Sequence, residues 1–395
     1  MIIGVVGKPN VGKSTFFKAS TMAEVAIAPY PFTTIKANEG VGFVKVKCPE
    51  VELKGKCKPN HGFCLDGWRF VPIKLLDVAG LVPGAHMGKG LGNKFLDDLR
   101  QADALIHVVD ASGLTNEEGK ATQDYDVTKD IKFLEDEIDR WFYGIVAENW
   151  KMLVRKAQIS EERPMDILAN QFSGLKITVD MIKTAAKNLH LEENFTAWTD
   201  EQLLELVREL RKLSKPMIIA ANKCDMPKAK ANVEKLKREF PGMLIVPCSA
   251  ESELALREAA RDSKIDYIAG EQDFKMNDDK LNEQQTKGLG FIKDKILGVY
   301  GSTGVQECLN QAVFSLLKYL VAWPVENENH FTDSKNNMLP DAMLMPQNST
   351  ALDLAFAIHT DIGNKFIAAV DARTHKRLSK EHKLNNNDII RIMTK

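Results

Sequence analysis

The first nineteen residues constrain the fold of this chain more than any other stretch. Residues 1–6 read MIIGVV, a short run rich in β-branched residues, and residues 7–14 read GKPNVGKS. The next residues, TFFKA, can open a helix. A strand, a glycine-rich loop and a helix in this order form the context in which GxxxxGK[ST] predicts a phosphate-binding P-loop. A chance match in a glycine-rich turn is the alternative, and the flanking strand and helix count against it.

The residues of this loop are suited to binding a polyphosphate. Glycines at 7 and 12 allow a tight turn with no Cβ in the way. The loop N–H groups then point inward at the N-terminus of the next helix. We expect Lys13 to reach the β- and γ-phosphates and the Ser14 hydroxyl to bind Mg²⁺. The expected phosphate-binding residues are Gly7, Asn10, Val11, Gly12, Lys13, Ser14 and Thr15.

Two further stretches carry groups that would complete a magnesium and γ-phosphate site. A proline-punctuated loop reads APYPFTT at 28–34, and we assign Thr34 rather than Thr33 as Mg²⁺ ligand and γ-phosphate sensor. A capped surface turn is the alternative. A buried-type strand ends in Asp77, whose carboxylate would hold Mg²⁺, and Gly80 follows with an N–H for the γ-phosphate. The expected catalytic residues are Lys13, Thr34 and Gly80.

Short apolar runs alternate with helical patterns along the chain. Besides the first strand and the one that ends at Asp77, we expect buried strands at 105–110, 217–221 and 243–247. Five such strands separated by helices predict an α/β fold, a P-loop doubly wound parallel sheet with right-handed connections. Ligands of such a sheet lie beyond the carboxyl ends of its strands, where residues 222–225 and 249–250 fall.

A cysteine-containing loop follows an alternating run at 41–47 that predicts a strand. Cys48, Cys57, His61 and Cys64 lie within seventeen positions and could place four ligands around one Zn²⁺. Their spacing is not one of the paired C-x2-C forms, so we favour the alternative, a hairpin loop with free or paired thiols. Six cysteines in 395 residues are too sparse for a disulfide scaffold.

Residues 111–215 contain no run strong enough to continue a sheet and are predicted to be helical. Apolar residues at 131, 134, 138, 141 and 142 fall on one helical face, and an amphipathic helix is also expected at 304–320. The predicted organisation is a nucleotide-binding domain at 1–114 and 215–270, a helical insertion at 115–214, a helical segment that closes this domain and a linker at 271–330, and a small domain at 331–395.

Composition sets the broad class. The formal net charge is −1, so no global field draws the chain to nucleic acid or to a membrane. No stretch reaches about 18 consecutive apolar residues, and the N-terminus lacks the pattern of a secretory signal. We therefore expect a cytoplasmic protein without a membrane partner, acting as a monomer.

The motifs together resemble the complete series of a GTPase in the right order. They are GKPNVGKS at 7–14, PFTT at 31–34, DVAG at 77–80, NKCD at 222–225 and SAE at 249–251. The segment at 77–110 resembles the Obg family, and within it the YchF-like branch of Obg-like NTPases. From about residue 338 the chain looks like a TGS module, a small β-grasp domain found with these GTPases, which makes 331–395 the TGS domain.

This resemblance implies a guanine nucleotide. Asp225 would accept the guanine N1 and N2 protons, Asn222 would contact the base edge, and the stem of Lys223 would pack on the ring. Ser249 and Ala250 would supply a backbone contact to guanine O6. Adenine presents no such proton pair, so a carboxylate here favours GTP over ATP. YchF itself departs from this motif and accepts ATP.

The resemblance also implies an activity, ions and partners. It indicates a slow Mg²⁺-dependent GTPase that acts as a switch on the ribosome or RNA, with K⁺ as a further ion because of Asn10. Leu81 stands where Ras-type GTPases have a glutamine, which leaves open how the attacking water is positioned. The alternatives are a YchF-type ATPase and a binding module that nucleotide only stabilises. Basic residues that could contact RNA phosphates, or simply be solvated, are Arg373, Lys376, Arg377, Lys380 and Lys383.

Overall fold

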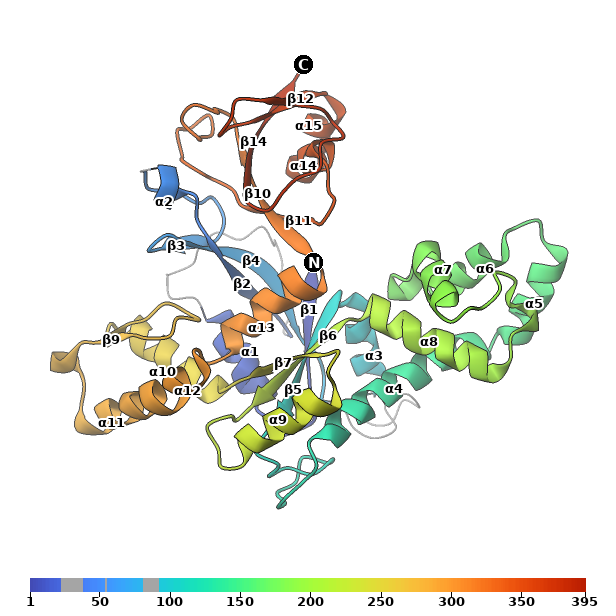
Figure 1. Ribbon diagram of the computed structural model, residues 1–395, viewed down its shortest axis with the longest axis horizontal. Coiled ribbons are helices and arrows are strands. Elements are labelled where there is room, and N and C mark those ends of the chain that lie inside the picture. Colours follow the sequence, from blue (N-terminus) through green and yellow to red (C-terminus); the bar gives the residue numbers. More distant parts are fainter. Residues whose placement is uncertain (23–37, 54, 81–91) are drawn as a thin grey trace.

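A central sheet flanked by helices connects a helical arm to a C-terminal β-domain, as Figure 1 shows. This computed structural model describes residues 1–22, 38–53, 55–80 and 92–395. The expectations for Thr33, Thr34 and Leu81 concern residues outside these ranges.

The central sheet contains the five parallel strands that the apolar runs predict. They are β1 (Ile2–Val6), β4 (Trp68–Asp77), β5 (Ala104–Asp110), β6 (Met217–Asn222) and β7 (Leu244–Pro247). Their order is β4-β1-β5-β6-β7, and each neighbouring pair is parallel. Every residue of β5 is buried, as a strand covered on both faces requires.

One edge of this sheet is antiparallel, which the prediction of a parallel sheet did not include. β2 (Glu39–Lys47) runs antiparallel to β4 along its whole length. β3 (Phe63–Leu65) also pairs antiparallel with β4, at residues 68–70. The short turn from β3 into β4 forces this direction, because a parallel pair would need a long crossover. The single-turn helix α2 (Glu50–Leu53) lies between β2 and β3.

Helices cover both faces of the sheet, as a doubly wound fold predicts. Two apolar cores lie between helices and sheet, one under α3, α4, α8 and α9 and the other under α1, α10 and α13. The P-loop therefore lies at the end of a strand that is packed from both sides. These helices are α1 (Lys13–Thr21), α3 (Gly92–Gln101), α4 (Thr128–Ala147), α8 (Asp200–Ser214), α9 (Ala229–Glu239), α10 (Ala250–Arg261) and α13 (Val305–Gln311).

The segment between β5 and β6 forms the helical arm, drawn in green in Figure 1. α4 and α8 lead into it, and α5 (Trp150–Ile159), α6 (Pro164–Gln171) and α7 (Val179–Asn188) complete it. The apolar faces of these helices join the core on one side of the sheet. α6 lies within the range predicted to be helical, but its eight residues are too few to show a period of their own. Among the described residues, no helix has the length and apolar character needed to cross a bilayer.

A small unit follows α10 and has its own apolar core. It contains β8 (Ile265–Asp266), β9 (Lys275–Met276), α11 (Glu283–Ile292) and α12 (Gly298–Tyr300). The chain then returns to the central sheet through α13.

The C-terminal domain is a five-stranded sheet with the order β11-β10-β14-β12-β13. α14 packs on it around a core that includes Leu354 and Ile390. This arrangement confirms the predicted β-grasp fold. Its elements are β10 (Tyr319–Val325), β11 (Met343–Pro346), α14 (Ala351–Ile358), α15 (Thr360–Asn364), β12 (Phe366–Asp371), β13 (Arg377–Leu378) and β14 (Asp388–Thr394).

β10 corrects the helix predicted at 304–320. The helix is α13 with a π-helical turn at Ala312–Leu316, and the chain enters β10 at Tyr319. The C-terminal sheet thus takes a strand from the segment that the sequence assigned to helices and a linker. Pairing with β11 and β14 decides this outcome, and such distant partners are invisible to local periodicity. Pro324 lies beyond the residues paired with β11, where one side of the strand is open.

Candidate functional site

The loop between β1 and α1 has the tight turn that its glycines predict. Gly12 has a φ of 91° and Asn10 a φ of 65°, so both are left-handed. A Cβ on Gly12 would lie 2.3 Å from Nδ2 of Asn222, and one on Gly7 would lie 2.6 Å from the carbonyl oxygen of Val108. Neither position has room for a side chain, so this path of the loop requires glycine at both.

A cleft of about 490 Å³ opens over this loop and joins it to the carboxyl ends of β6 and β7. Gly7 and Val11 do not line it, and Val11 is fully buried in the core beneath. Most of the residues predicted to hold phosphates and base are brought together here, although they come from distant parts of the chain. The lining residues are Lys8, Pro9, Asn10, Gly12, Lys13, Ser14, Thr15, Gly80, Asn222, Lys223, Asp225, Met226, Ser249, Ala250 and Glu251.

Lys13 and Asp77 form an ion pair at the P-loop end of the site. Lys13 opens α1 and Asp77 ends β4, which is the neighbour of β1 in the sheet. Their side chains are 14% and 28% exposed, so both charges can be reached by a ligand. A phosphate would compete for this ammonium group, and a divalent cation would compete for this carboxylate.

Asn222 joins the P-loop to the loop that follows β7. Its Nδ2 donates to the carbonyl oxygen of Val11 at 2.8 Å, and its Oδ1 accepts from the N–H of Ala250 at 2.9 Å. The residue is only 3% exposed. Because backbone groups engage both ends of the amide, Asn222 fixes the separation of the two loops rather than pointing its amide freely at a base.

The backbone N–H groups of Ser249 and Ala250 are also engaged within the protein. Ser249 donates to the carbonyl oxygen of Thr303 at 2.9 Å, and Ala250 donates to Asn222 as described. These two N–H groups, expected to bind guanine O6, therefore already have partners.

Lys223 and Asp225 are the charged groups of the NKCD motif. The ammonium group of Lys223 donates to the carbonyl oxygen of Asn10 at 2.9 Å and pairs with Asp110 at 2.8 Å, so its side chain extends along the P-loop. Asp225 lines the cleft, and its Oδ1 accepts from the hydroxyl of Ser249 at 2.8 Å. The Ser249 hydroxyl thereby orients the Asp225 carboxylate at the cleft.

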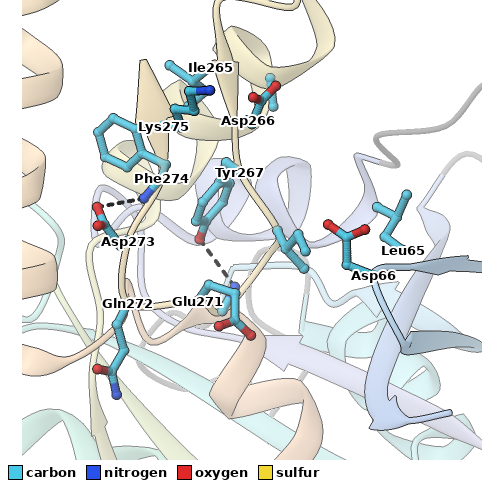
Figure 2. A pocket seen from close by; sticks show the side chains of 13 residues that line it. Leu65, Asp66, Ile265, Asp266, Tyr267, Glu271, Gln272, Asp273, Phe274 and Lys275 are labelled. Carbon is cyan, nitrogen blue, oxygen red and sulfur yellow. Dashed lines mark hydrogen bonds between the residues drawn. The ribbon is translucent and has the colours of Figure 1, made fainter. Parts of the chain in front are cut away.

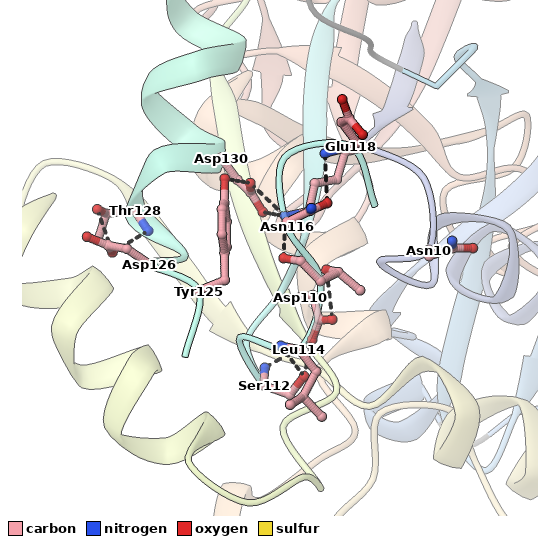
Figure 3. Close-up of polar contacts among 12 residues, drawn as sticks. Asn10, Asp110, Ser112, Leu114, Asn116, Glu118, Tyr125, Asp126, Thr128 and Asp130 are labelled. Carbon is pink, nitrogen blue, oxygen red and sulfur yellow. Dashed lines mark hydrogen bonds and ion pairs between the residues drawn. The ribbon is translucent and has the colours of Figure 1, made fainter. Parts of the chain in front are cut away.

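A buried polar cluster behind the P-loop was missed by the sequence reasoning. Asp110 accepts from the hydroxyl of Thr115 at 3.0 Å, and the ammonium group of Lys8 lies 2.8 Å from Asp130. Figure 3 shows Asp110 near the residues that follow β5 and Tyr125 against Asp130. Burial lowers the pKa of Lys8 and raises that of Asp130, and their ion pair opposes both shifts. The sequence feature that could have indicated this cluster is Asp110, a carboxylate at the end of a predicted strand.

The segment after β5 covers one side of the P-loop through this cluster. Lys8 donates to the carbonyl oxygen of Thr115 at 2.9 Å, and Asn10 donates to that of Gly119 at 3.0 Å. Gly119 has a φ of 78°, and a Cβ there would lie 2.5 Å from the carbonyl oxygen of Pro9. The P-loop is therefore held in place by contacts to the strand ends and to this segment.

A larger cavity of about 920 Å³ lies away from the P-loop, along residues 265–275 and next to residues 65–66 (Figure 2). The hydroxyl of Tyr267 donates to Glu253 at 2.8 Å and accepts from the N–H of Gly270 at 3.2 Å. Burial raises the pKa of Tyr267 well above its usual value, so the hydroxyl stays protonated. The Tyr267 hydroxyl therefore serves the fold, and the residues expected to bind phosphate line the cleft over the P-loop instead.

Three of the four candidate zinc ligands come together. The ligand atoms of Cys48, Cys57 and Cys64 lie with a carboxylate oxygen of Glu50, all within 4.8 Å of one another. His61 is not in this group. It is exposed, and Gly62, with a φ of 71°, turns the chain before β3. The structure thus places Glu50, and not His61, beside the three cysteines. All six cysteines are free thiols.

The fold and the cleft define the class of this protein. A P-loop follows the first strand of a doubly wound sheet, and NKCD and SAE motifs follow two later strands. This is the architecture of a P-loop GTPase domain.

Family models match most of the chain. Residues 2–141 match the 50S ribosome-binding GTPase model, and residues 220–327 match the G4 motif-containing domain of YGR210-like Obg-like GTPases. Residues 335–394 match the TGS domain.

Related proteins give the family. The chain is 51% identical over 394 residues to a GTP-binding protein of Methanocaldococcus jannaschii, covering 100% of this chain and 99% of that one. It is 40% identical over 361 residues to a GTP-binding protein of Schizosaccharomyces pombe, covering 89% and 88%. It is 32% identical over 268 residues to the ribosome-binding ATPase YchF of Bacillus subtilis, covering 64% and 66%. The chain belongs to the Obg family and is a GTP-binding protein of its YchF-like branch.

Solved structures agree with this fold. A GTP-binding protein from Pyrococcus horikoshii superposes with a TM-score of 0.82 at 38% identity, with 100% of both chains covered. The YchF GTPase of Schizosaccharomyces pombe superposes with a TM-score of 0.58 at 20% identity, covering 100% of this chain and 97% of that chain, and so supports the fold.

Proposed function

We propose that this protein hydrolyses GTP to GDP and phosphate with Mg²⁺ and acts in the cytoplasm as a slow, ribosome-associated switch. The assignment of guanine nucleotide rests on Asp225, whose carboxylate lines the cleft and accepts a hydrogen bond from the Ser249 hydroxyl. A carboxylate here accepts the N1 and N2 protons of guanine, whereas adenine would leave it unpaired. The carbon stem of Lys223 would support the base.

Adenine nucleotide is the second candidate, because relatives at lower identity are named ATPases. They include Obg-like ATPase 1 of Homo sapiens, 30% identical over 285 residues, and YchF of Bacillus subtilis. The spelling NKCD and the position of Asp225 favour guanine in this chain.

The phosphate end of the cleft fits a magnesium nucleotide. The Ser14 hydroxyl and the Asp77 carboxylate would hold Mg²⁺, and both are the hard oxygen ligands that this ion prefers. Thr34 joins them in the proposal on sequence grounds. When bound, Mg²⁺ would neutralise negative charge on the phosphates.

The chain's own groups would act on the γ-phosphate by charge stabilisation. Lys13 would bind the β- and γ-phosphate oxygens, and the P-loop N–H groups with that of Gly80 would hold the γ-phosphate while water attacks in line. The P-loop is held by hydrogen bonds from Lys8 to Thr115, from Asn10 to Gly119 and from Asn222 to Val11, so its groups would need little reorganisation during the reaction. We also propose that K⁺ binds near Asn10 and stabilises the charge that develops on the phosphates.

Single-turnover hydrolysis tests the reaction. We expect Lys13→Ala to lower the rate of GTP cleavage by about 100-fold or more, since a preorganised charge is lost. Lys18→Ala is the matched control, because Lys18 lies on the same helix but is exposed and pairs with Glu258. Equal rates in wild type and Lys13→Ala would instead support a binding module that nucleotide only stabilises. Replacing KCl by NaCl at equal ionic strength tests the K⁺ proposal.

Fewer of the basic residues of the TGS domain are available to RNA than the five named from the sequence. Arg373 is not free, because it pairs with Glu52 and donates to the carbonyl oxygen of Asn387 at 2.7 Å. Lys380 and Lys383 are exposed. We expect the double change Lys380→Glu and Lys383→Glu to weaken co-sedimentation with ribosomes and flatten its salt dependence. Lys287→Glu on α11 is the control, and an equal effect of both variants would exclude the TGS surface.

A further inference from the structure

The cysteine loop between β2 and β4 brings four metal-ligating side chains to one point. Cys48 directly follows β2, Glu50 opens α2, Cys57 lies in the loop and Cys64 lies in β3. Their ligand atoms are all within 4.8 Å of one another. Thiolates in a tetrahedral zinc site lie about 3.8 Å apart, because Zn–S bonds are about 2.3 Å long. Small side-chain movements would therefore close these four groups around one ion.

Hydrogen bonds already hold the carboxylate of this cluster in position. One oxygen of Glu50 accepts from the N–H of Cys57 at 2.7 Å, and the other accepts from the thiol of Cys64 at 3.0 Å. The N–H of Cys48 donates to the carbonyl oxygen of Gly67 at 2.8 Å, which fixes the first ligand to the turn before β4. Cys48 itself is 3% exposed. The cluster is thus ordered by the backbone and shielded from solvent on one side.

A buried cation beside the cluster indicates that negative charge belongs there. Arg69 is opposite Cys64 in the β3–β4 ladder, so their side chains share one face of the sheet. Arg69 is fully buried, and its Nε and Nη1 have no hydrogen-bond partner. Its Nη2 donates to the carbonyl oxygen of Leu339 at 2.6 Å. Its Cζ lies 5.1 Å from the centroid of the Trp323 ring, and within the described part of the chain its hydrogen-bond partner is this carbonyl and not a carboxylate.

The missing counter-charge is what a loaded metal site would provide. A buried guanidinium without an anion is costly, since one backbone hydrogen bond and the contact with Trp323 repay its desolvation only in part. Three thiolates and one carboxylate around a divalent ion carry about two excess negative charges. Neutral thiols would leave Arg69 without a negatively charged partner.

We propose that Cys48, Glu50, Cys57 and Cys64 bind one zinc ion. Zinc suits this set because it accepts thiolate and carboxylate ligands together in tetrahedral geometry. All four positions are taken by protein side chains, which is typical of a structural rather than a catalytic site. The ion has no part in the nucleotide chemistry, which lies at the opposite end of β4.

The consequence of this site is a fixed contact between the GTPase domain and the TGS domain. The same loop donates from the N–H of Lys58 to Met338 at 2.9 Å and from that of Asn60 to Pro340 at 2.8 Å. Cys48 belongs to an apolar cluster with Trp323 and Ile389 of the C-terminal sheet. Figure 1 shows α2 and β3 on the side of the sheet that faces this domain. Zinc would stiffen the loop that carries these contacts.

Metal analysis of the full chain, purified under reducing conditions, tests the proposal. We expect about one equivalent of zinc in wild type and almost none in Cys57→Ser. His61→Ala is the matched control, because His61 lies in the same loop outside the cluster, and it should retain the metal. Metal lost equally from both variants, or none bound by wild type supplied with zinc, would overturn the proposal.

Cobalt substitution covers the case in which Cys57→Ser does not fold. Titration of Co²⁺ into the metal-free wild-type chain should produce thiolate-to-cobalt charge-transfer absorption, which Zn²⁺ then abolishes. Glu50→Gln, which keeps all thiols, should lower zinc affinity by about tenfold or more. Absence of the cobalt bands in reduced protein, or mass spectrometry showing a Cys57–Cys64 disulfide as the stable form under reducing conditions, would contradict the site.

Removal of zinc should also loosen the domain contact. Hydrogen exchange at the amides of Lys58 and Asn60 should become faster in the metal-free chain, because the loop loses its anchor. Amides of β5 on the opposite part of the sheet serve as the reference and should not change. Unchanged exchange at Lys58 and Asn60 would refute the docking role of the ion.

Discussion

Gly12 and Asn222 meet at the floor of the nucleotide cleft, although Gly12 lies in the loop after β1 and Asn222 ends β6, more than 200 residues later. The amide nitrogen of Asn222 occupies the space that a Cβ on Gly12 would need, and it donates to Val11. A P-loop glycine could be predicted from the motif alone. The amide that closes on it could not, because the motif suggests a contact to the base rather than to the loop.

Substitution of Gly12 by alanine should damage the loop and not the fold as a whole. The left-handed φ of 91° costs alanine about 1–2 kcal/mol, and contact with Asn222 adds to this. We expect a loss of nucleotide affinity of at least about tenfold in calorimetric titration. Gly144→Ala in α4 is the control, since a Cβ there meets nothing within 4 Å. It should stabilise the protein by about 0.5–1 kcal/mol, and similar affinities in both variants would contradict this view of the loop.

His107 gives the protein a sensitivity to acid. It is buried in β5, and desolvation, followed by the nearby charge of Lys8, lowers its pKa to about 3 from a usual 6.5. Between these values the unfolded chain binds a proton that the folded chain does not, so stability falls as pH falls below about 6.5. The slope from this group is about 1.4 kcal/mol per pH unit.

The change His107→Phe should remove this contribution. Urea unfolding would give the free energy of unfolding of each protein at pH 7 and at pH 4.5. The decrease from pH 7 to pH 4.5 should be roughly 2–3 kcal/mol smaller in the variant than in wild type. His359→Phe, at an exposed position, should keep the wild-type dependence. Parallel pH profiles for wild type and His107→Phe would show that His107 is not the source.

Local pattern predicted which segments form strands, and tertiary pairing decided how some of them run. The buried strands could be predicted from the sequence, because apolar runs end in polar groups such as Asp77 and Asp110. The antiparallel edge and β10 could not be predicted in this way, since each depends on pairing with a strand far along the chain. The same limit applies to the segment after β5, whose contact with the P-loop runs through buried Lys8 and Asp130.

Asp130→Ala should be strongly destabilising, because it leaves Lys8 buried and unpaired. We expect a loss of about 3–5 kcal/mol in the free energy of unfolding. The double change Lys8→Met and Asp130→Leu should recover much of this loss, since no charge remains buried. Asp136→Ala on the exposed face of α4 should cost less than about 1 kcal/mol. A double variant no more stable than Asp130→Ala would show that packing, not charge, dominates at this position.

The whole molecule combines a nucleotide cleft with a C-terminal domain that contacts the loop between β2 and β3 of the same sheet. The sequence indicated both domains through their motifs. It did not show that the cysteine loop joins them, because Cys57 and Cys64 meet Glu50 only once β3 has paired with β4. Likewise the carboxylate of Asp225 reaches the P-loop cleft only when β6 and β1 lie on either side of β5.

Calorimetric titration with GDP and with non-hydrolysable analogues of GTP and ATP is the most direct test of the nucleotide assignment. Wild type, Asp225→Ala and the control Glu251→Gln, another carboxylate of the same cleft, would be compared. We predict strong preference for guanine in wild type and Glu251→Gln, and loss of that preference in Asp225→Ala. Equal affinity of wild type for adenine and guanine nucleotides would contradict a GTPase and identify an ATPase of the YchF type.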